Sequence, residues 1–140
     1  MTTPPHLVRL MAHVAFRGKL GPEDAESYVF ANQLREATLN GKLRAVWTHP
    51  AQELCHAKGG RMMIQAAKAR ALGMITGTSD FLFMWSGRNL AIEMKSKTGT
   101  LTPGQKDFAG WCHDNGVPYF VARSSDAALA LLVEYGVLVR

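Results

Sequence analysis

The feature that most constrains the fold is a pair of short apolar runs in mid-chain with a polar turn sequence between them. Residues 81–85 read Phe-Leu-Phe-Met-Trp, residues 90–94 read Leu-Ala-Ile-Glu-Met, and Ser-Gly-Arg-Asn fills 86–89. Runs of this length around a glycine-containing turn are typical of a β-hairpin, here with a four-residue loop that sets Trp85 opposite Leu90. We therefore expect two antiparallel strands at the centre of the fold.

The expected register places charged side chains together on one sheet face. In that register Leu82 faces Glu93, and Asp80 faces Lys95. Because side chains alternate along a strand, these four residues would share a face, with Asp80 and Glu93 as diagonal neighbours about 7–8 Å apart. Two carboxylates at that separation can converge on one cation, with an ammonium group beside them.

This arrangement has a chemical reading and a structural one. Converging carboxylates repel each other and need a cation or a proton between them. Oxygen ligands suit Mg²⁺ or Mn²⁺, which can bind a phosphate oxygen and lower the pKa of a bound water. Lys95 could then hold the attacking water or neutralise charge in the transition state. The alternative is a surface strand with alternating charge and an Asp80–Lys95 ion pair, and the spacing alone leaves both readings open.

In these residues and in the stretches that follow them, the sequence resembles the VRR-NUC (virus-type replication-repair nuclease) domain family of the PD-(D/E)XK nuclease superfamily. The resemblance starts at Arg61, covers about two thirds of the chain, and rests on four stretches in the family's order. They are the turn at 77–80, Glu-Met-Lys at 93–95, Gly-Thr-Leu-Thr-Pro-Gly-Gln at 99–105, and Gly-Val-Pro-Tyr-Phe-Val at 116–121. Ser79 stands where the family usually has Pro.

The resemblance implies a restriction-endonuclease-like α/β fold, a mixed sheet flanked by helices. It implies that Asp80 and Glu93 bind Mg²⁺ or Mn²⁺ together with the main-chain carbonyl of Met94, and that Lys95 is the catalytic lysine. It also places Gln105 beside the site, at the start of the following helix.

Two assignments keep an alternative. Family members carry an acidic residue on an early helix, for which we expect Glu26, with Glu23 as second choice. Gln105 lies in Thr102-Pro103-Gly104-Gln105, a capping-box sequence. Helix capping alone would therefore explain Gln105, although a cap and an active-site role are compatible.

The function implied is a metal-dependent endonuclease that hydrolyses DNA phosphodiester bonds, structure-specific on branched DNA such as four-way (Holliday) junctions, and homodimeric. The alternatives are a restriction-type or nonspecific DNA nuclease, and a non-catalytic DNA-binding module. The complete set of Asp80, Glu93 and Lys95 favours a working site over a vestigial one.

Composition agrees with a small DNA-binding enzyme. The 140 residues fit a single domain, 1–140, of which residues 1–20 form an N-terminal helical extension and candidate dimer surface. Hydrophobic residues make up 47%, and the net charge of +5 with a pI of about 9.5 is consistent with nucleic-acid binding. The sequence shows neither an apolar run of 18 residues nor a signal peptide. Its two cysteines make no disulfide framework, so we expect a cytoplasmic protein without a membrane partner.

Periodicity and turn residues predict the remaining elements. The order after residue 60 is helix, hairpin, helix, strand, helix, which indicates a mixed α/β sheet. We expect helices over 6–16, 22–40, 61–72, 103–115 and from a Ser125 cap to about 136, strands over 45–48 and 118–122, and a loop over 52–60.

Two further patterns have competing readings. Cys55-His56 and Cys112-His113 raise the possibility of a zinc site, which their spacing disfavours because adjacent residues rarely both reach one ion. The three tryptophans could stack on bases, but their apolar neighbours favour core packing for Trp47, Trp85 and Trp111.

Overall fold

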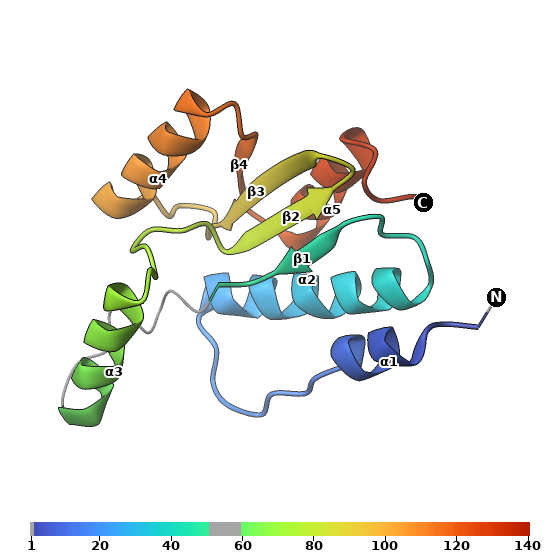
Figure 1. Ribbon diagram of the computed structural model, residues 1–140, viewed down its shortest axis with the longest axis horizontal. Helices are drawn as coiled ribbons and strands as arrows, with labels where there is room; N and C mark the ends of the chain where they lie inside the picture. Colours follow the sequence, from blue (N-terminus) through green and yellow to red (C-terminus); the bar gives the residue numbers. More distant parts are fainter. Residues whose placement is uncertain (1, 51–59) are drawn as a thin grey trace.

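The computed structural model describes residues 2–50 and 60–140 (Figure 1). These residues form five helices and four strands. In chain order they are α1 (Pro5–Met11), α2 (Pro22–Leu39), β1 (Val46–Thr48), α3 (Gly60–Ala71), β2 (Phe81–Trp85), β3 (Arg88–Met94), α4 (Pro103–Asp114), β4 (Tyr119–Ala122) and α5 (Ser125–Glu134).

The strands form one mixed sheet in the order β1-β2-β3-β4. The pairs β1–β2 and β2–β3 are antiparallel, whereas β3 and β4 are parallel and joined through α4. A parallel pair needs such a crossover connection, which explains why a helix separates these two strands. The prediction of a mixed α/β sheet flanked by helices is confirmed.

The hairpin register differs from the expected one by two residues. Trp85 pairs with Arg88 rather than Leu90, so the loop has two residues, Ser86 and Gly87, instead of four. Both loop residues have positive φ, 44° and 73°, as in the tight turns that match the right-handed twist of a hairpin. The shift is even, so each side chain stays on its predicted face while its partner changes.

The two sheet faces are covered by different helices. Large apolar side chains of β2 and β3 point toward α2 and α5 and form the core with Phe30, Leu34 and Leu132. The Phe30 ring meets the Phe81 ring edge-on at 4.9 Å between centroids. On the opposite face, α4 lies against β4 through Phe108 and Tyr119. Glu93 and Lys95 extend onto this second face, since they alternate with the core-facing Ile92 and Met94.

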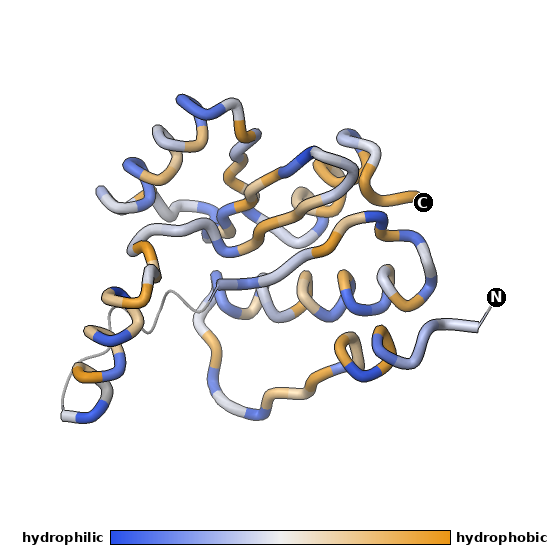
Figure 2. The backbone as a smooth tube through the Cα atoms, viewed as in Figure 1, coloured by the Kyte–Doolittle hydropathy of each residue, from blue (hydrophilic) through white to orange (hydrophobic). Residues whose placement is uncertain are grey.

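The N-terminal helix is shorter than predicted and leaves most of its apolar side chains in solvent. It ends at Met11 instead of residue 16. Asn32 of α2 bonds both the N–H and the carbonyl of Val14, and the Tyr28 hydroxyl accepts the Phe16 N–H, so side chains of α2 take the backbone groups that a longer helix would use. Figure 2 shows apolar residues along this segment outside the core.

Several smaller expectations also change. The last helix is capped by Ser124, whose hydroxyl accepts the Ala127 N–H, so Ser125 is its first residue instead of its cap. Trp47 and Trp85 pack against the core as predicted, but Trp111 is 55% exposed, so its core assignment is wrong. Gly60, expected in a loop, begins α3.

Two sequence features fall in the gap between the described ranges. The rest of the loop predicted over 52–60 and the Cys55-His56 pair lie outside the described residues. Within 2–50 and 60–140, none of the helices combines the length and apolarity needed to cross a membrane.

Candidate active site

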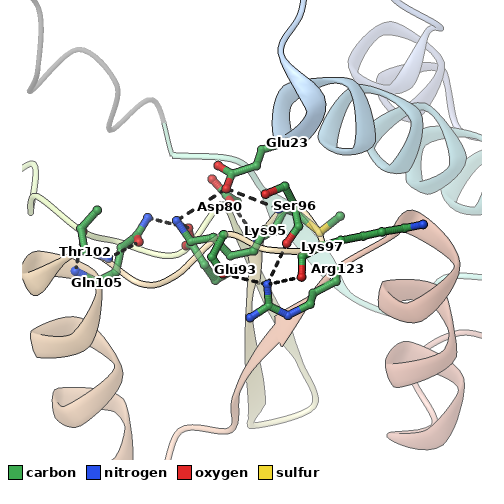
Figure 3. Close-up of polar contacts among 11 residues, drawn as sticks. Glu23, Asp80, Glu93, Lys95, Ser96, Lys97, Thr102, Gln105 and Arg123 are labelled. Atoms are coloured by element: carbon green, nitrogen blue, oxygen red, sulfur yellow. Dashed lines mark hydrogen bonds and ion pairs between the residues drawn. The ribbon is translucent and has the colours of Figure 1, made fainter.

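The predicted site residues other than Glu26 meet at the end of β3, where elements from across the chain converge (Figure 3). Glu93 and Lys95 come from β3 and the residue just after it, and Asp80 precedes β2. The start of α4 brings Gln105 from one side, and the start of α2 brings Glu23 from another. Glu93 is 1% exposed and Lys95 is 6% exposed. The reading of a charged surface strand is therefore wrong.

Asp80 and Glu93 are closer partners than the sequence suggested. Continuing the observed register one pair beyond Phe81 and Ile92 sets Asp80 opposite Glu93, rather than on a diagonal. Opposed residues in an antiparallel pair have Cβ atoms about 5 Å apart. The Asp80 carboxylate is further fixed by the Met94 N–H, which donates to Oδ2 at 2.7 Å.

Burial and mutual repulsion make both carboxylates reluctant to ionise. Burial raises the pKa of Asp80, although the Met94 N–H opposes that rise. For Glu93, burial first and the negative charge of Asp80 second raise the pKa from 4.5 to about 8. Two neighbouring carboxylates that are slow to lose their protons are a place where a divalent cation binds favourably, because the cation replaces the proton.

Lys95 lies between two carboxylates. Its Nζ is 3.9 Å from Glu93 Oε1 and 3.8 Å from Glu23 Oε1. Both distances exceed hydrogen-bonding length, so the two contacts are electrostatic. The ammonium N–H groups do not donate to either glutamate and can donate to a ligand that enters the site. A buried ammonium with loose partners is weak support for folding and a suitable group for chemistry.

Gln105 serves as cap and as site residue at once. The side-chain Oε1 of Gln105 accepts the main-chain N–H of Thr102 at 2.9 Å, and the main-chain N–H of Gln105 donates to the Thr102 hydroxyl. Together these two hydrogen bonds form the predicted capping box. The Nε2 of Gln105 donates to Glu93 Oε1 at 2.7 Å. The capping reading is confirmed, and the cap also fixes the side chain that contacts Glu93, so the active-site role predicted for Gln105 is compatible with it.

A glycine brings α4 this close to the site. Gly77 has a φ of 90°, and a Cβ at this position would lie 2.3 Å from the Gly104 main chain and 2.7 Å from the Gln105 nitrogen. Any larger residue would push the start of α4 away from the turn that precedes Asp80. The Gly77 to Asp80 sequence thus sets the position of Gln105 as well as that of the aspartate.

The early-helix acid at the site is Glu23, the second choice from sequence. Besides its contact with Lys95, Glu23 accepts the Ser96 N–H at 3.4 Å. Glu26 instead accepts the Ser125 N–H at 2.7 Å and so ties α2 to the start of α5. One helical turn separates the two glutamates, and the sequence does not show which turn reaches the end of the sheet.

Arg123 is a neighbour of the site that sequence reasoning missed. Its Nη1 donates to the carbonyls of Ser96 and Gly99 at 2.7 and 2.8 Å, which fastens the loop after Lys95 to the end of β4. A lone arginine after a strand gives no local signal of such a contact. Only the parallel pairing of β3 and β4 brings the two segments together.

The side chains at the site offer a small set of oxygen donors to a hard divalent cation. Among the described residues, no group of three or more His, Cys, Asp and Glu side chains is gathered for a metal. Two carboxylates are nevertheless enough for Mg²⁺, which keeps several waters and uses substrate phosphates as ligands. Glu93 Oε2 is buried and, within the described residues, has no hydrogen-bond partner, so its lone pairs are available to other ligands.

The Met94 carbonyl is oriented toward this same place. Lys95 donates its N–H to the carbonyl of Ala122 in β4, and Ala91 donates its N–H to the carbonyl of Pro118 just before β4, both at 2.9 Å. Backbone groups of successive residues in a strand point to opposite sides, so those of Met94, next to Lys95, point away from β4 and toward Asp80. The Met94 N–H already bonds Asp80 there, and the carbonyl can complete a ligand set with the two carboxylates.

Comparison with known proteins supports the fold. No family model and no curated protein matches this chain. Among solved structures, it is similar to a protein described as a VRR_NUC domain protein, with a TM-score of 0.58 and 20% sequence identity over 84% of this chain and 90% of that one. The chain therefore has the VRR-NUC fold, as its motifs predicted.

Proposed function

We propose that this chain, with its VRR-NUC fold, is a metal-dependent endonuclease that hydrolyses DNA phosphodiester bonds with Mg²⁺ or Mn²⁺. The observation that carries the proposal is the cluster at the end of β3, where the half-buried Asp80 lies opposite the buried Glu93 and the buried Lys95 lies beside them. Burying Glu93 and Lys95 there costs folding free energy, and no packing role explains them. A catalytic role does.

Each residue has a distinct part in the proposed reaction. Asp80, Glu93 and the Met94 carbonyl would hold the cation, with Glu23 as a further acidic group in place of Glu26. When bound, the cation would supply Lewis-acid stabilisation of the phosphate and a lowered pKa for a bound water. Gln105 orients the Glu93 carboxylate through its amide N–H.

Lys95 is the general acid–base and electrostatic group of this scheme. Its ammonium lies within 4 Å of Glu23 and of Glu93, so it can orient an attacking water and offset the negative charge that builds on the phosphate oxygens. These interactions strengthen as the transition state forms, which makes the lysine a determinant of rate.

We further propose that branched DNA, such as a four-way junction, is the preferred substrate and that the active form is a homodimer. Two strands of a junction need to be cut, and two sites related by a two-fold axis would cut them as a pair. The net charge of +5 supports binding to the phosphate backbone. Arg61, Lys68 and Arg70 are on the exposed surface of α3, which extends away from the sheet (Figure 1).

The decisive experiment incubates the protein with linear, flap, splayed and four-way DNAs in Mg²⁺, Mn²⁺ or excess chelator. We expect cleavage that disappears in chelator and returns with either metal. Asp80→Asn and Glu93→Gln should each abolish it while the circular dichroism spectrum is retained. Undiminished cleavage in chelator, or near-native rates in either variant, would overturn the mechanism. Equal cleavage of linear and branched DNA would remove only the junction preference.

A non-catalytic DNA-binding module is the second candidate, and it is favoured by the absence, among the described residues, of a cluster of three or more His, Cys, Asp or Glu side chains that could hold a metal. In that case the ammonium would contact phosphate only. DNA would then be bound with the same affinity in chelator and in Mg²⁺, and none of the substrates would be cut.

A further inference from the structure

Tyr119 carries a hydroxyl group that the proposed site does not yet use. It is the first residue of β4 and pairs with Ala91, while Val121, two residues on, pairs with Glu93. Paired and alternate residues of neighbouring strands share a face, so the side chains of Tyr119 and Glu93 extend from the same side of the sheet.

Both side chains lie beneath neighbouring positions of α4. Gln105 contacts Glu93, and the Phe108 ring lies 6.3 Å from the Tyr119 ring between centroids. Residues three apart on a helix are adjacent on its surface. The tyrosine and the glutamate are therefore covered by the same stripe of α4.

Two buried oxygens in this region have unused hydrogen-bonding capacity. Tyr119 Oη and Glu93 Oε2 are both inaccessible to solvent, and neither has a hydrogen-bond partner within the described residues. Buried polar atoms nearly always have partners, directly or through ordered water. Burial, and then the negative charges of Glu93 and Asp80, raise the pKa of the Tyr119 hydroxyl, which places it within electrostatic reach of both carboxylates.

We propose that Tyr119 is a positioning residue for Glu93, its hydroxyl donating a hydrogen bond through one ordered water to Oε2 while Gln105 holds Oε1. The carboxylate would then be oriented from both oxygens, and its ionised form would be favoured. Such outer partners of a ligating carboxylate commonly change metal affinity by about 10- to 100-fold. The consequence for metal binding rests on the proposed function.

The test compares Tyr119→Phe with Tyr135→Phe in protein stripped of metal. Each variant removes one hydroxyl, but Tyr135 contacts Phe120, whose side chain extends from the other face of the sheet. We expect Tyr119→Phe to bind Mn²⁺ about 10- to 100-fold more weakly by titration calorimetry. The half-saturating Mn²⁺ concentration for cleavage should rise in the same ratio, and Tyr135→Phe should match the wild type. Wild-type Mn²⁺ affinity in Tyr119→Phe would overturn the proposal.

A second measurement separates this inference from the proposed function. If the wild-type protein binds no Mn²⁺, the proposed function fails, and the hydrogen bond is tested in chelator by the melting temperatures of Tyr119→Phe, Glu93→Gln and the double variant. Contact through one water predicts that the double variant's shift differs from the sum of the single shifts. Additive shifts would refute the contact.

Discussion

The end of β3 and the N-terminal segment are opposite exceptions to the usual burial of apolar side chains and exposure of charged ones. At the end of β3, Glu93 and Lys95 are charged and almost fully buried. In the N-terminal segment, Val8, Leu10, Val14 and Phe16 are apolar and at least half exposed, with values of 50%, 67%, 52% and 55%. We call these four residues the N-terminal apolar patch.

The two exceptions carry different information. Buried charges oppose folding, so the first region points to chemistry performed inside the chain. Exposed apolar side chains cost little in the isolated chain but gain free energy when covered, so the second points to an interaction with something outside it. If the end of β3 sets the cleavage rate and the N-terminal segment sets the assembly of the dimer, substitutions in the two regions have separable effects.

The largest effect is expected at Lys95. Lys95→Ala should lower the maximal cleavage rate by about 100-fold or more while DNA and metal still bind, because the ammonium acts in the transition state. Lys95→Met keeps the buried aliphatic stem and controls for packing. Rapid single-turnover kinetics at saturating DNA would measure the step. An unchanged maximal rate with weaker DNA binding would make Lys95 a phosphate contact instead.

The next effect is on stability in the absence of metal. The folded protein holds the Glu93 proton up to about pH 8, whereas the unfolded chain releases it near the usual pKa of 4.5. Between these values the folded state binds more protons, so the free energy of unfolding falls as pH rises. We expect Glu93→Gln to unfold at higher denaturant than the wild type at pH 8 in chelator, by on the order of 1–3 kcal/mol.

The control for this measurement is Glu134→Gln, which changes an exposed carboxylate on α5. It should retain the wild-type dependence of stability on pH. A Glu93→Gln variant that loses stability between pH 5 and 8 as steeply as the wild type would show that Glu93 is already ionised in the folded, metal-free protein.

A smaller effect is expected from the N-terminal apolar patch. Leu10→Glu combined with Phe16→Glu should weaken the homodimer at least about tenfold, or 1.4 kcal/mol, and reduce the preference for branched DNA. Light scattering after gel filtration would measure the assembly. Leu72→Glu, at a 78% exposed position after α3, is the matched control and should leave it intact. A wild type that is monomeric at working concentration would assign the patch to another partner.

The sequence predicted the central fold well because its signals are local there. Each of three features has a recognisable pattern within a few residues: the runs that flank the Ser86–Gly87 turn, the Thr102–Gln105 capping box, and the strand at 119–122. The same local signals put Asp80 and Glu93 on one face, since a register error of two residues does not change the face of any side chain.

What the sequence could not predict depends on contacts between distant segments. Glu23 rather than Glu26 reaches Lys95 because of how α2 meets the end of the sheet, at a residue 72 positions downstream of Glu23. The early end of α1 depends on Asn32 and Tyr28, which occupy backbone groups of the N-terminal segment. Neither contact has a signature in the residues around it, so tertiary structure decides both.

The smallest effect separates the two parts played by Gln105. Gln105→Ala and Thr102→Ala each break the capping box and should each cost about 1 kcal/mol of stability. Only Gln105→Ala also removes the amide donor to Glu93 Oε1, so it alone should slow turnover, by about tenfold. Urea unfolding and steady-state cleavage, measured on both variants, would distinguish the parts. Equal turnover in the two variants would show that Gln105 acts only as a helix cap and that other neighbours of Glu93 orient its carboxylate.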